Sequence, residues 1–422
     1  MQNPKLKTRN KVIFTPMKSF EVPIIYRSPL ISAIKAKRKE MDKMKKDFTP
    51  TLLDFGTLQI YLARHFGFCY GVENAIEIAF RTVEENPGKR IFLLSEMIHN
   101  PQVNADLLAH GIQFMQDTSG KQVIPFEEIT RDDIVLIPAF GTTLEIEEKL
   151  SRIGIQTEKY NTTCPFVEKV WNRSDVIAKK KYTIVIHGKP THEETRATFS
   201  HAAATAPCII VKDIAEAKEL AKYITGEKNV NEFYTEFNNQ YSYGFDIKKD
   251  LLRIGVVNQT TMLASDTLAI ADFLKQVMLK TYNPDDTEDR FADTRDTLCY
   301  ATHDNQAAVI GMLKTTADLA IVVGGYNSSN TSHLVELCEE TLPTFFINND
   351  EKIVSAKAIL HHNFHTKKEI LTTDYLPAKE PVSVLLTSGA SCPDALVEGV
   401  INKLTGFFKT KITTEQIIGQ FQ

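Results

Sequence analysis

The chain has 422 residues, of which 43% are hydrophobic and 24% are charged, values typical of a globular protein with two or three domains. No apolar run approaches the roughly 18–20 residues of a membrane span, the start of the chain lacks the apolar stretch of a secretory signal, and the net charge of −4 does not favour nucleic-acid binding. Six cysteines are too few for a disulfide scaffold, so we expect reduced thiols and a cytoplasmic location.

The first 57 residues are predicted to form a basic extension. Residues 1–48 carry 13 Lys and Arg against 4 Asp and Glu, and Ala33–Lys46 is expected to be a solvated basic helix. Binding to nucleic acid or to a membrane is not expected, because the rest of the chain is acidic and lacks an aromatic-basic recognition pattern. A plastid transit peptide, with a location in the stroma, is the lesser alternative because the segment is poor in Ser.

Three cysteines further along the chain share one context. Each follows a short segment and opens a predicted helix, and a buried strand begins about 20 residues later. The helical stretches come directly after Cys69, Cys164 and Cys299. The strands begin at Ile91, Tyr182 and Leu319. The organisation of the chain is therefore repeated three times, although the residues themselves are not.

Each of these strands ends in a polar loop, and a second strand in each repeat ends in another. The first loops contain His99, His192 and Ser328, and the second strands and loops lie within 133–143, 252–261 and 382–391. Alternating helices and short apolar strands indicate parallel sheets, which bind ligands at the carboxyl ends of their strands. We predict an α/β protein with three pseudo-equivalent units whose cysteines and loops face one centre.

The predicted units span residues 58–150, 151–280 and 281–403, and a tail follows over 404–422. The segment 229–250 is polar and aromatic without a clear period, so we expect an exposed insertion in the middle unit.

The cysteines at the helix starts differ from the others. Cys208, in a strand, and Cys338, in a helix, are expected to be small buried hydrophobic residues, and Cys392 could line the site. A helix N-terminus lowers the pKa of a thiol and favours the thiolate that binds metal. Three distant thiolates match neither a closed zinc site nor a ferredoxin. They favour an iron–sulfur cluster with one open iron that acts as a Lewis acid on a substrate oxygen.

The polar loops supply small donors that suit an anion such as diphosphate. The alternatives are histidines satisfied within their loops and serines that only cap a helix. The candidate ligands are His99, His192, Ser328, Ser329, Asn330 and Ser391. Glu194 is placed to deliver a proton, with Thr260 and Thr261 as relay or positioning groups. A first-turn helix acid is the alternative for Glu194.

These motifs together resemble the 4-hydroxy-3-methylbut-2-enyl diphosphate reductase family (IspH/LytB), from about residue 58 to about residue 402. The segments that carry the resemblance are GFCYGVENAI, EMIHNPQVN, TTCPFVEKV, HGKPTHEET, NQTT, CYATHDNQ, NSSN and SGASCPD. The resemblance implies a trefoil of three α/β domains around a 4Fe-4S cluster held by Cys69, Cys164 and Cys299. It also implies a reductive dehydroxylation that yields isopentenyl and dimethylallyl diphosphate, the last step of the non-mevalonate isoprenoid pathway, with electrons from a ferredoxin or flavodoxin.

The resemblance implies the same residue roles. Six positions would bind the diphosphate, and Glu194, Thr260 and Thr261 would deliver a proton and position the substrate. The six are His99, His192, Ser328, Ser329, Asn330 and Ser391.

The sequence departs from the bacterial family pattern at Phe140, where that pattern has a histidine. Phe cannot donate to a phosphate, so His187 or Lys189 is a candidate for the missing contact. The PAFG motif around Phe140, the insertion and the long N-terminal arm resemble the plant and cyanobacterial branch.

Two other functions compete with this one. Quinolinate synthase also uses three cysteines and three domains, but a dicarboxylate would need Arg or Lys clamps, and the central loops contain mostly Ser, Thr, Asn and His. A non-enzymatic iron–sulfur sensor or electron carrier would leave Glu194 and the converging loops without a role.

Overall fold

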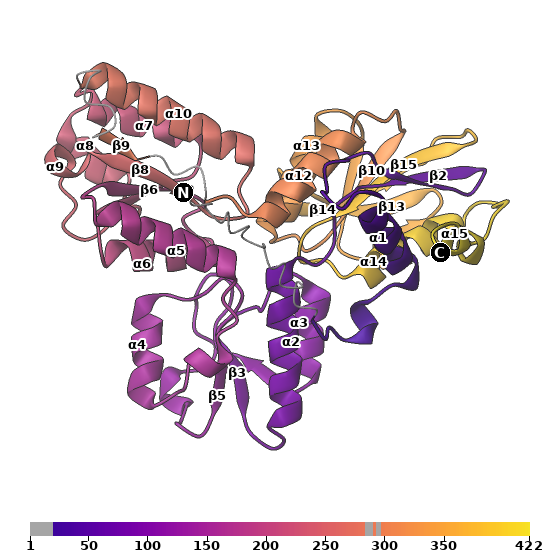
Figure 1. Ribbon diagram of the computed structural model, residues 1–422, viewed down its shortest axis with the longest axis horizontal. Coiled ribbons are helices and arrows are strands. Elements are labelled where there is room, and N and C mark those ends of the chain that lie inside the picture. Colours follow the sequence, from indigo (N-terminus) through magenta and orange to yellow (C-terminus); the bar gives the residue numbers. More distant parts are fainter. Residues whose placement is uncertain (1–19, 283–289, 293–296) are drawn as a thin grey trace, which may run out of the picture.

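The computed structural model describes residues 20–282, 290–292 and 297–422. Three α/β lobes surround a common centre, and each contains one parallel sheet (Figure 1). The predicted fold class is confirmed. None of the helices within the described ranges combines the length and the apolar content needed to cross a membrane.

The first lobe follows Cys69 and holds a parallel sheet of order β4-β3-β5. Its strands are β3 (Ile91–Leu93), β4 (Ile112–Phe114) and β5 (Ile134–Leu136). Its helices are α2 (Tyr70–Glu85), α3 (Pro101–Ala109) and α4 (Leu144–Ile153), with 3-10 turns η2 (Phe126–Glu128) and η3 (Glu158–Tyr160).

The second lobe follows Cys164 and holds a parallel sheet of order β7-β6-β8-β9. Its strands are β6 (Thr183–His187), β7 (Cys208–Val211), β8 (Ile254–Asn258) and β9 (Phe291–Ala292). Its helices are α5 (Pro165–Ala178), α6 (Glu193–Ala203), α7 (Ile214–Ile224), α8 (Val230–Glu236), α9 (Ile247–Asp250) and α10 (Ala264–Thr281).

The third lobe combines both ends of the described chain in a sheet of order β1-β2-β15-β10-β11, in which only β1 is antiparallel. Its strands are β1 (Thr51–Asp54), β2 (Leu58–Leu62), β10 (Leu319–Val323), β11 (Thr344–Ile347) and β15 (Val382–Ser388). Its helices are α1 (Pro29–Met41), α12 (Tyr300–Met312), α13 (Ser329–Glu339), α14 (Asp394–Thr405) and α15 (Thr414–Gln420), with 3-10 turns η1 (Ile24–Tyr26) and η5 (Asp350–Lys352).

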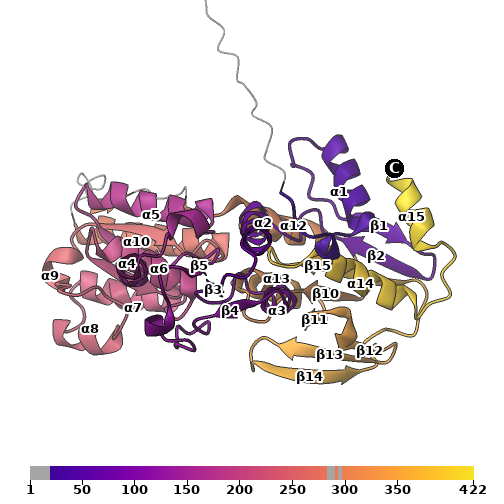
Figure 2. The same cartoon turned by 90° about the horizontal axis from the view of Figure 1, so that it is seen from below.

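A small antiparallel sheet is attached to the third lobe as a separate layer (Figure 2). Its strands are β12 (Ile353–Ser355), β13 (Ala358–Asn363) and β14 (Lys368–Thr373). The pairing of β13 with β14 runs from Ala358 opposite Thr373 to Asn363 opposite Lys368, which leaves a short turn between the strands.

The three parallel sheets share one arrangement. The first strand after each cysteine, β3, β6 or β10, lies between the two strands that follow it in its unit. The chain therefore reverses its direction of winding beside the central strand, which is where open α/β sheets bind ligands. Two polar loops per lobe are brought to this edge, as the sequence predicts.

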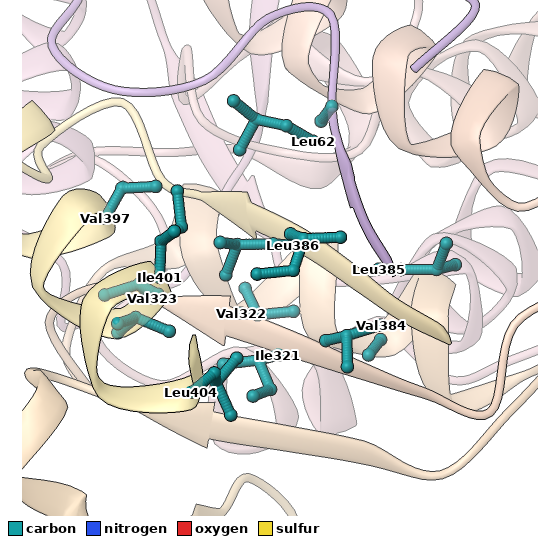
Figure 3. Packing of buried hydrophobic residues seen from close by; sticks show 14 of the residues in the cluster. Leu62, Ile321, Val322, Val323, Val384, Leu385, Leu386, Val397, Ile401 and Leu404 are labelled. Carbon is teal, nitrogen blue, oxygen red and sulfur yellow. The ribbon is translucent and has the colours of Figure 1, made fainter. Parts of the chain in front are cut away.

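The third lobe has the largest apolar core. Its two central strands, β10 and β15, are buried on both faces, with 0% exposure at Ile321, Val322, Leu385 and Leu386. Figure 3 shows residues of these strands against Val397, Ile401 and Leu404 of α14. Runs of consecutive apolar residues are expected in strands that are covered on both sides.

The chain before residue 58 packs more closely than predicted. Phe20, Val22 and Tyr26 are buried in the core of the first lobe. Helix α1 begins after the cap Ser28 and buries Leu30, Ile31 and Ile34 in the third lobe. The described part of the basic segment therefore has one apolar face and links the first lobe to the third. The boundary expected at residue 58 also differs, because β1 and β2 belong to the sheet of the third lobe.

The expectation that residues 229–250 are exposed holds for most of their polar side chains but is wrong for their three phenylalanines. Phe233 and Phe237 are buried to 0% and 1% exposure, and Phe245 lies against Phe233 with ring centroids 5.5 Å apart. These rings close one face of the second lobe, beside Tyr223 of α7. Polar residues separate the buried phenylalanines, so the apolar face is not evident from the sequence.

Replacing Phe233 with Ala is expected to lower the free energy of unfolding by about 3–5 kcal/mol, because it empties a closed aromatic cluster. Chemical denaturation followed by circular dichroism measures the change. Replacing Tyr243 with Ala, a fully exposed aromatic residue of the same segment, serves as the control and is expected to cost less than about 0.5 kcal/mol. Equal effects would contradict the packing of this segment.

Candidate active site

One cavity at the centre of the three lobes is lined by every predicted site residue. The space between its side chains amounts to about 650 Å³, part of it open to solvent. The predicted residues that line it are Cys69, His99, Cys164, His192, Glu194, Thr260, Thr261, Cys299, Ser328, Ser329, Asn330 and Ser391. The loops after β3, β6 and β10 and the loops after β5, β8 and β15 contribute to this cavity.

Each of the three cysteines occupies the N-cap position of a helix, as predicted. Cys69 precedes α2, Cys164 precedes α5 and Cys299 precedes α12, all with extended backbone angles. Pro165 is the first residue of α5, where its missing N–H leaves no hydrogen bond unmade. The free N–H groups of three helix starts are therefore directed toward the same point.

The predicted lowering of the thiol pKa values is wrong for the protein alone. Burial raises the pKa of Cys69 to about 12, although backbone hydrogen bonds from Gly71 and Val72 oppose it. Burial also raises the pKa of Cys164 and of Cys299, and the nearby Cys69 adds to the shift at Cys164. The free energy lost when a thiolate is removed from water is larger than the stabilisation that the helix N–H groups provide. Stable thiolates in this cavity need a positively charged partner.

The donor set and its surroundings fit an iron–sulfur cluster. Three sulfur ligands come from three separate lobes, and soft thiolates are the usual ligands of such clusters. Gly71 lies so near Cys164 that a Cβ would collide with the Sγ atom, so the wall is closed against side chains at that point. Within the described ranges, no three His, Cys, Asp or Glu side chains are grouped to hold a single ion.

Glu194 lies in the first turn of α6 with 1% exposure. The backbone N–H of Thr260 donates to its Oε1 at 2.5 Å, and the Thr260 hydroxyl donates to its Oε2 at 3.0 Å. Burial raises the pKa of Glu194 to about 7, while both Thr260 hydrogen bonds oppose the shift. A buried carboxyl held by two donors can both keep and release a proton near neutral pH.

His192 is the N-cap of α6, and its ring is fixed as a donor. The backbone N–H of Glu194 donates to Nδ1 of His192 at 3.2 Å, so the proton of the neutral ring is carried by Nε2. Burial holds the pKa of His192 well below its usual value. Nε2 is buried and has no hydrogen-bond partner among the described residues, which leaves it available to an acceptor in the cavity.

His99 and Phe140 stack on each other, with ring centroids 4.3 Å apart. Nδ1 of His99 lies 3.3 Å from Oε2 of Glu96, and Nε2 lies 3.6 Å from Oε2 of Glu193. The edge of His192 meets both rings, at 5.2 Å from His99 and 5.6 Å from Phe140. The sequence indicates only a lost phosphate contact at Phe140, whereas in the structure its ring contacts the rings of both histidines.

The serine and asparagine side chains are partly committed to the fold. Ser328 caps α13 by accepting from the N–H of Thr331, and Ser391 donates to the carbonyl of His99 at 3.2 Å. Asn330 accepts from the N–H of Ala390 at 2.9 Å through Oδ1, while its Nδ2 is buried without a hydrogen-bond partner among the described residues. The amide thus presents a spare donor.

Gln259 is a site residue that sequence reasoning missed, although it lies in the quoted NQTT motif. It is fully buried, and its Nε2 donates to Thr261 at 2.7 Å and to Ser329 at 3.2 Å. Its Oε1 accepts from the N–H of Lys189 and from the hydroxyl of Thr195. A single amide therefore fixes loops from the second and third lobes. Only its position directly after β8 could have indicated this.

Neither candidate for the missing phosphate contact lines the central cavity. His187 is buried in β6 with Nδ1 2.9 Å from the hydroxyl of Thr267, so it is a structural histidine. Lys189 lines an adjoining cavity, together with His99 and His192.

His187 makes stability depend on pH. Burial lowers its pKa to about 4 in the folded chain, whereas an unfolded chain has about 6.5. Above about pH 6.5 the ring is neutral in both states and does not lower the free energy of unfolding. As the pH falls from about 6.5 toward about 4, the unfolded chain takes up the proton first, so the folded chain is destabilised. Replacing His187 with Gln is expected to reduce the loss of unfolding free energy over this range by up to about 3 kcal/mol. Denaturant unfolding at about pH 7 and about pH 4.5 measures it; equal acid sensitivity would contradict it.

Comparison with known proteins shows the family of the chain. The family described as LytB protein matches residues 60–405. A 4-hydroxy-3-methylbut-2-enyl diphosphate reductase of Gloeobacter violaceus is 39% identical over 83% of this chain and 83% of its own, and one of a Synechococcus species is 40% identical over 83% and 86%. The solved Plasmodium falciparum E-1-hydroxy-2-methyl-but-2-enyl-4-diphosphate reductase shares the fold, with a TM-score of 0.58 and 23% identity over 83% of this chain and 88% of that chain. The chain belongs to the LytB family.

Proposed function

We propose that this protein catalyses the reductive dehydroxylation of 4-hydroxy-3-methylbut-2-enyl diphosphate, the last step of the non-mevalonate isoprenoid pathway. The allylic C–O bond breaks, two electrons and two protons are taken up, and water leaves together with isopentenyl or dimethylallyl diphosphate. The observation that carries the proposal is the convergence of three thiols, one buried carboxyl and several neutral donors on one cavity. The names of the cyanobacterial relatives support it.

Cys69, Cys164 and Cys299 are proposed to hold a 4Fe-4S cluster, which supplies electrons and an open iron site that polarises the substrate hydroxyl. The protein places these thiols at helix starts, where backbone N–H groups moderate the charge on sulfur. Cys299 is buried, and Cys69 and Cys164 are half-buried in the cavity wall.

The diphosphate is proposed to lie against the donors on the other side of the cavity. Nε2 of His192 and Nδ2 of Asn330 both lack a partner among the described residues, as an anion site requires before it is filled. Ser328, Ser329 and Ser391 add hydroxyl groups at the start of α13 and after β15. The start of a helix favours a phosphate group through its free N–H groups.

Glu194 is proposed to deliver a proton to the reacting carbon or to the departing hydroxyl. Its burial keeps it protonated at a higher pH than an exposed carboxyl. Thr260 holds both oxygens of the carboxyl, and Thr261 is positioned through Gln259. Glu194 is thereby held in one orientation.

The two rival functions have less support. No Arg or Lys is found among the described residues that line the central cavity, so the clamps expected for a dicarboxylate in a quinolinate synthase are missing there. A sensor or electron carrier has no use for a buried proton donor and unpartnered histidine and amide nitrogens. The electron donor is proposed to be a ferredoxin or flavodoxin.

The cluster is tested by anaerobic purification and by counting iron and sulfide. About four of each per chain are expected, and replacing Cys69, Cys164 or Cys299 with Ser is expected to lower both counts strongly. Cys208→Ala is the matched control, because Cys208 is buried in β7 outside the cavity. Mössbauer spectra with four fully thiolate-ligated irons would refute the open iron position.

Replacing Glu194 with Gln is expected to lower turnover by about 100- to 10,000-fold, because the amide cannot give up a proton. Binding of the substrate is expected to remain, since Gln keeps the shape of the side chain and the contact with Thr260. Turnover is measured with a reduced electron donor and binding by calorimetry. Wild-type turnover in this variant would remove Glu194 from the mechanism.

A further inference from the structure

A second cavity adjoins the candidate active site and shares three of its lining residues. The shared residues are His99, His192 and Ser329, and the space between its side chains amounts to about 1020 Å³, part of it open to solvent. All three lobes contribute to its walls: Thr118 from the first, Lys189 from the second, and His362 and Lys367 from the third. We call this second space the mouth cavity.

Two lysine side chains in the mouth cavity come from different lobes and meet at one ring. Nζ of Lys367 lies 3.7 Å and Nζ of Lys189 lies 5.9 Å from the centroid of Phe364. Phe364 and Lys367 belong to the turn between β13 and β14, and Lys189 follows β6. Neither ammonium has a carboxylate within ion-pair distance in the part of the chain that the structure describes, so both charges are available to a ligand.

The acidic groups near the lysines form no ion pair with them, although Oε2 of Glu193 is buried without a hydrogen-bond partner among the described residues. Glu193 lines the mouth cavity, but its carboxylate accepts from Ser95 and lies 3.6 Å from Nε2 of His99. Glu336 lies near both lysines and is hydrogen-bonded to Nδ1 of His333 at 2.6 Å. Burial and the neighbouring Lys367 hold the pKa of Lys189 below its usual value, while Glu336 opposes the shift.

The turn that carries Lys367 is unusual in its backbone. Lys367 has a φ of 57°, in the left-handed region where hairpin turns normally place glycine or asparagine. Asn363 holds the turn by accepting from the N–H groups of His365 and Thr366 through its side chain. The turn carries the exposed side chain of Lys367 to the wall of the mouth cavity.

The inner diphosphate site contains no Lys or Arg among its described lining residues. His192 is neutral, His99 lies beside Glu96 and Glu193, and the remaining donors are hydroxyl and amide groups. A diphosphate carries several negative charges, and burying them beside neutral donors alone is costly. Lys189 is close enough to His192 to act on its pKa, and Lys367 lines the same adjoining cavity as Lys189 and the two shared histidines.

We propose that Lys189 and Lys367 form a second anion subsite in the mouth cavity, which binds the terminal phosphate of the substrate's diphosphate and neutralises its charge from the outer side. The proposal rests on the proposed function for the identity of the ligand. The β12–β14 sheet is then part of the substrate site, because it carries one of the two cations to the mouth. Lys189 takes over the phosphate contact that Phe140 cannot make.

The subsite is tested with inorganic pyrophosphate by calorimetry on the full chain. Lys189→Met and Lys367→Asn are each expected to weaken pyrophosphate binding by about tenfold or more. Asn tolerates the left-handed backbone of residue 367, so this variant preserves the turn. Lys367→Arg is expected to restore binding. Lys368→Met removes the same charge one residue away, at an exposed position outside the cavity, and is expected to change binding by less than about twofold.

Steady-state turnover separates this proposal from the proposed function. Both lysine variants are expected to raise KM by a larger factor than they lower kcat. Pyrophosphate binding that depends on both lysines, in a protein without reductase activity, would support the subsite and refute the function. Pyrophosphate affinity and KM within about twofold of wild type in both variants would refute the subsite and leave the function standing.

Discussion

The structure depends on one electrostatic constraint, which is the burial of several acidic groups at a single point. Three thiols and Glu194 line the same cavity, and burial raises the pKa of each of them. The helix starts supply partial positive charge through their N–H groups, but not enough to keep thiolates. Full positive charge has to come from the proposed cluster on one side of the cavity and, in our proposal, from two lysines on the other.

The fold meets this constraint by repetition. Each lobe places a helix start and two strand ends at the centre, so three similar units supply three thiols and six loops. A single lobe could not supply all of these groups, because each sheet reverses its direction of winding once and so has one ligand-binding edge. Side chains such as Gln259, which bonds to residues of two lobes, then fix the loops relative to one another.

Much of this arrangement could be predicted because its signals are local. The cysteine-led helices and the strands at Ile91, Tyr182 and Leu319 follow from short patterns, and the repeated order of elements indicates where the loops meet. Other features depend on distant partners. The apolar face of α1 is hidden among lysines, and the thiol pKa values depend on burial that no local pattern reports. Phe233 is buried by Tyr223, Phe237 and Phe245, whose spacing follows no single helical or strand period. The mouth cavity could not be predicted from the sequence, because its two lysines are 178 positions apart.

The link between lobes has a consequence for how the molecule assembles. Helix α1 is made early, yet it packs against α14 and α15 near the other end of the chain, and Lys35 pairs with Asp394 at 2.7 Å. Strands β1 and β2 likewise join their sheet only through the pairing of β2 with β15. Contacts so distant in sequence form late, because the long intervening chain must first become ordered. The third lobe therefore closes last, and the first and second lobes can fold while the early segment still lacks its docking surface.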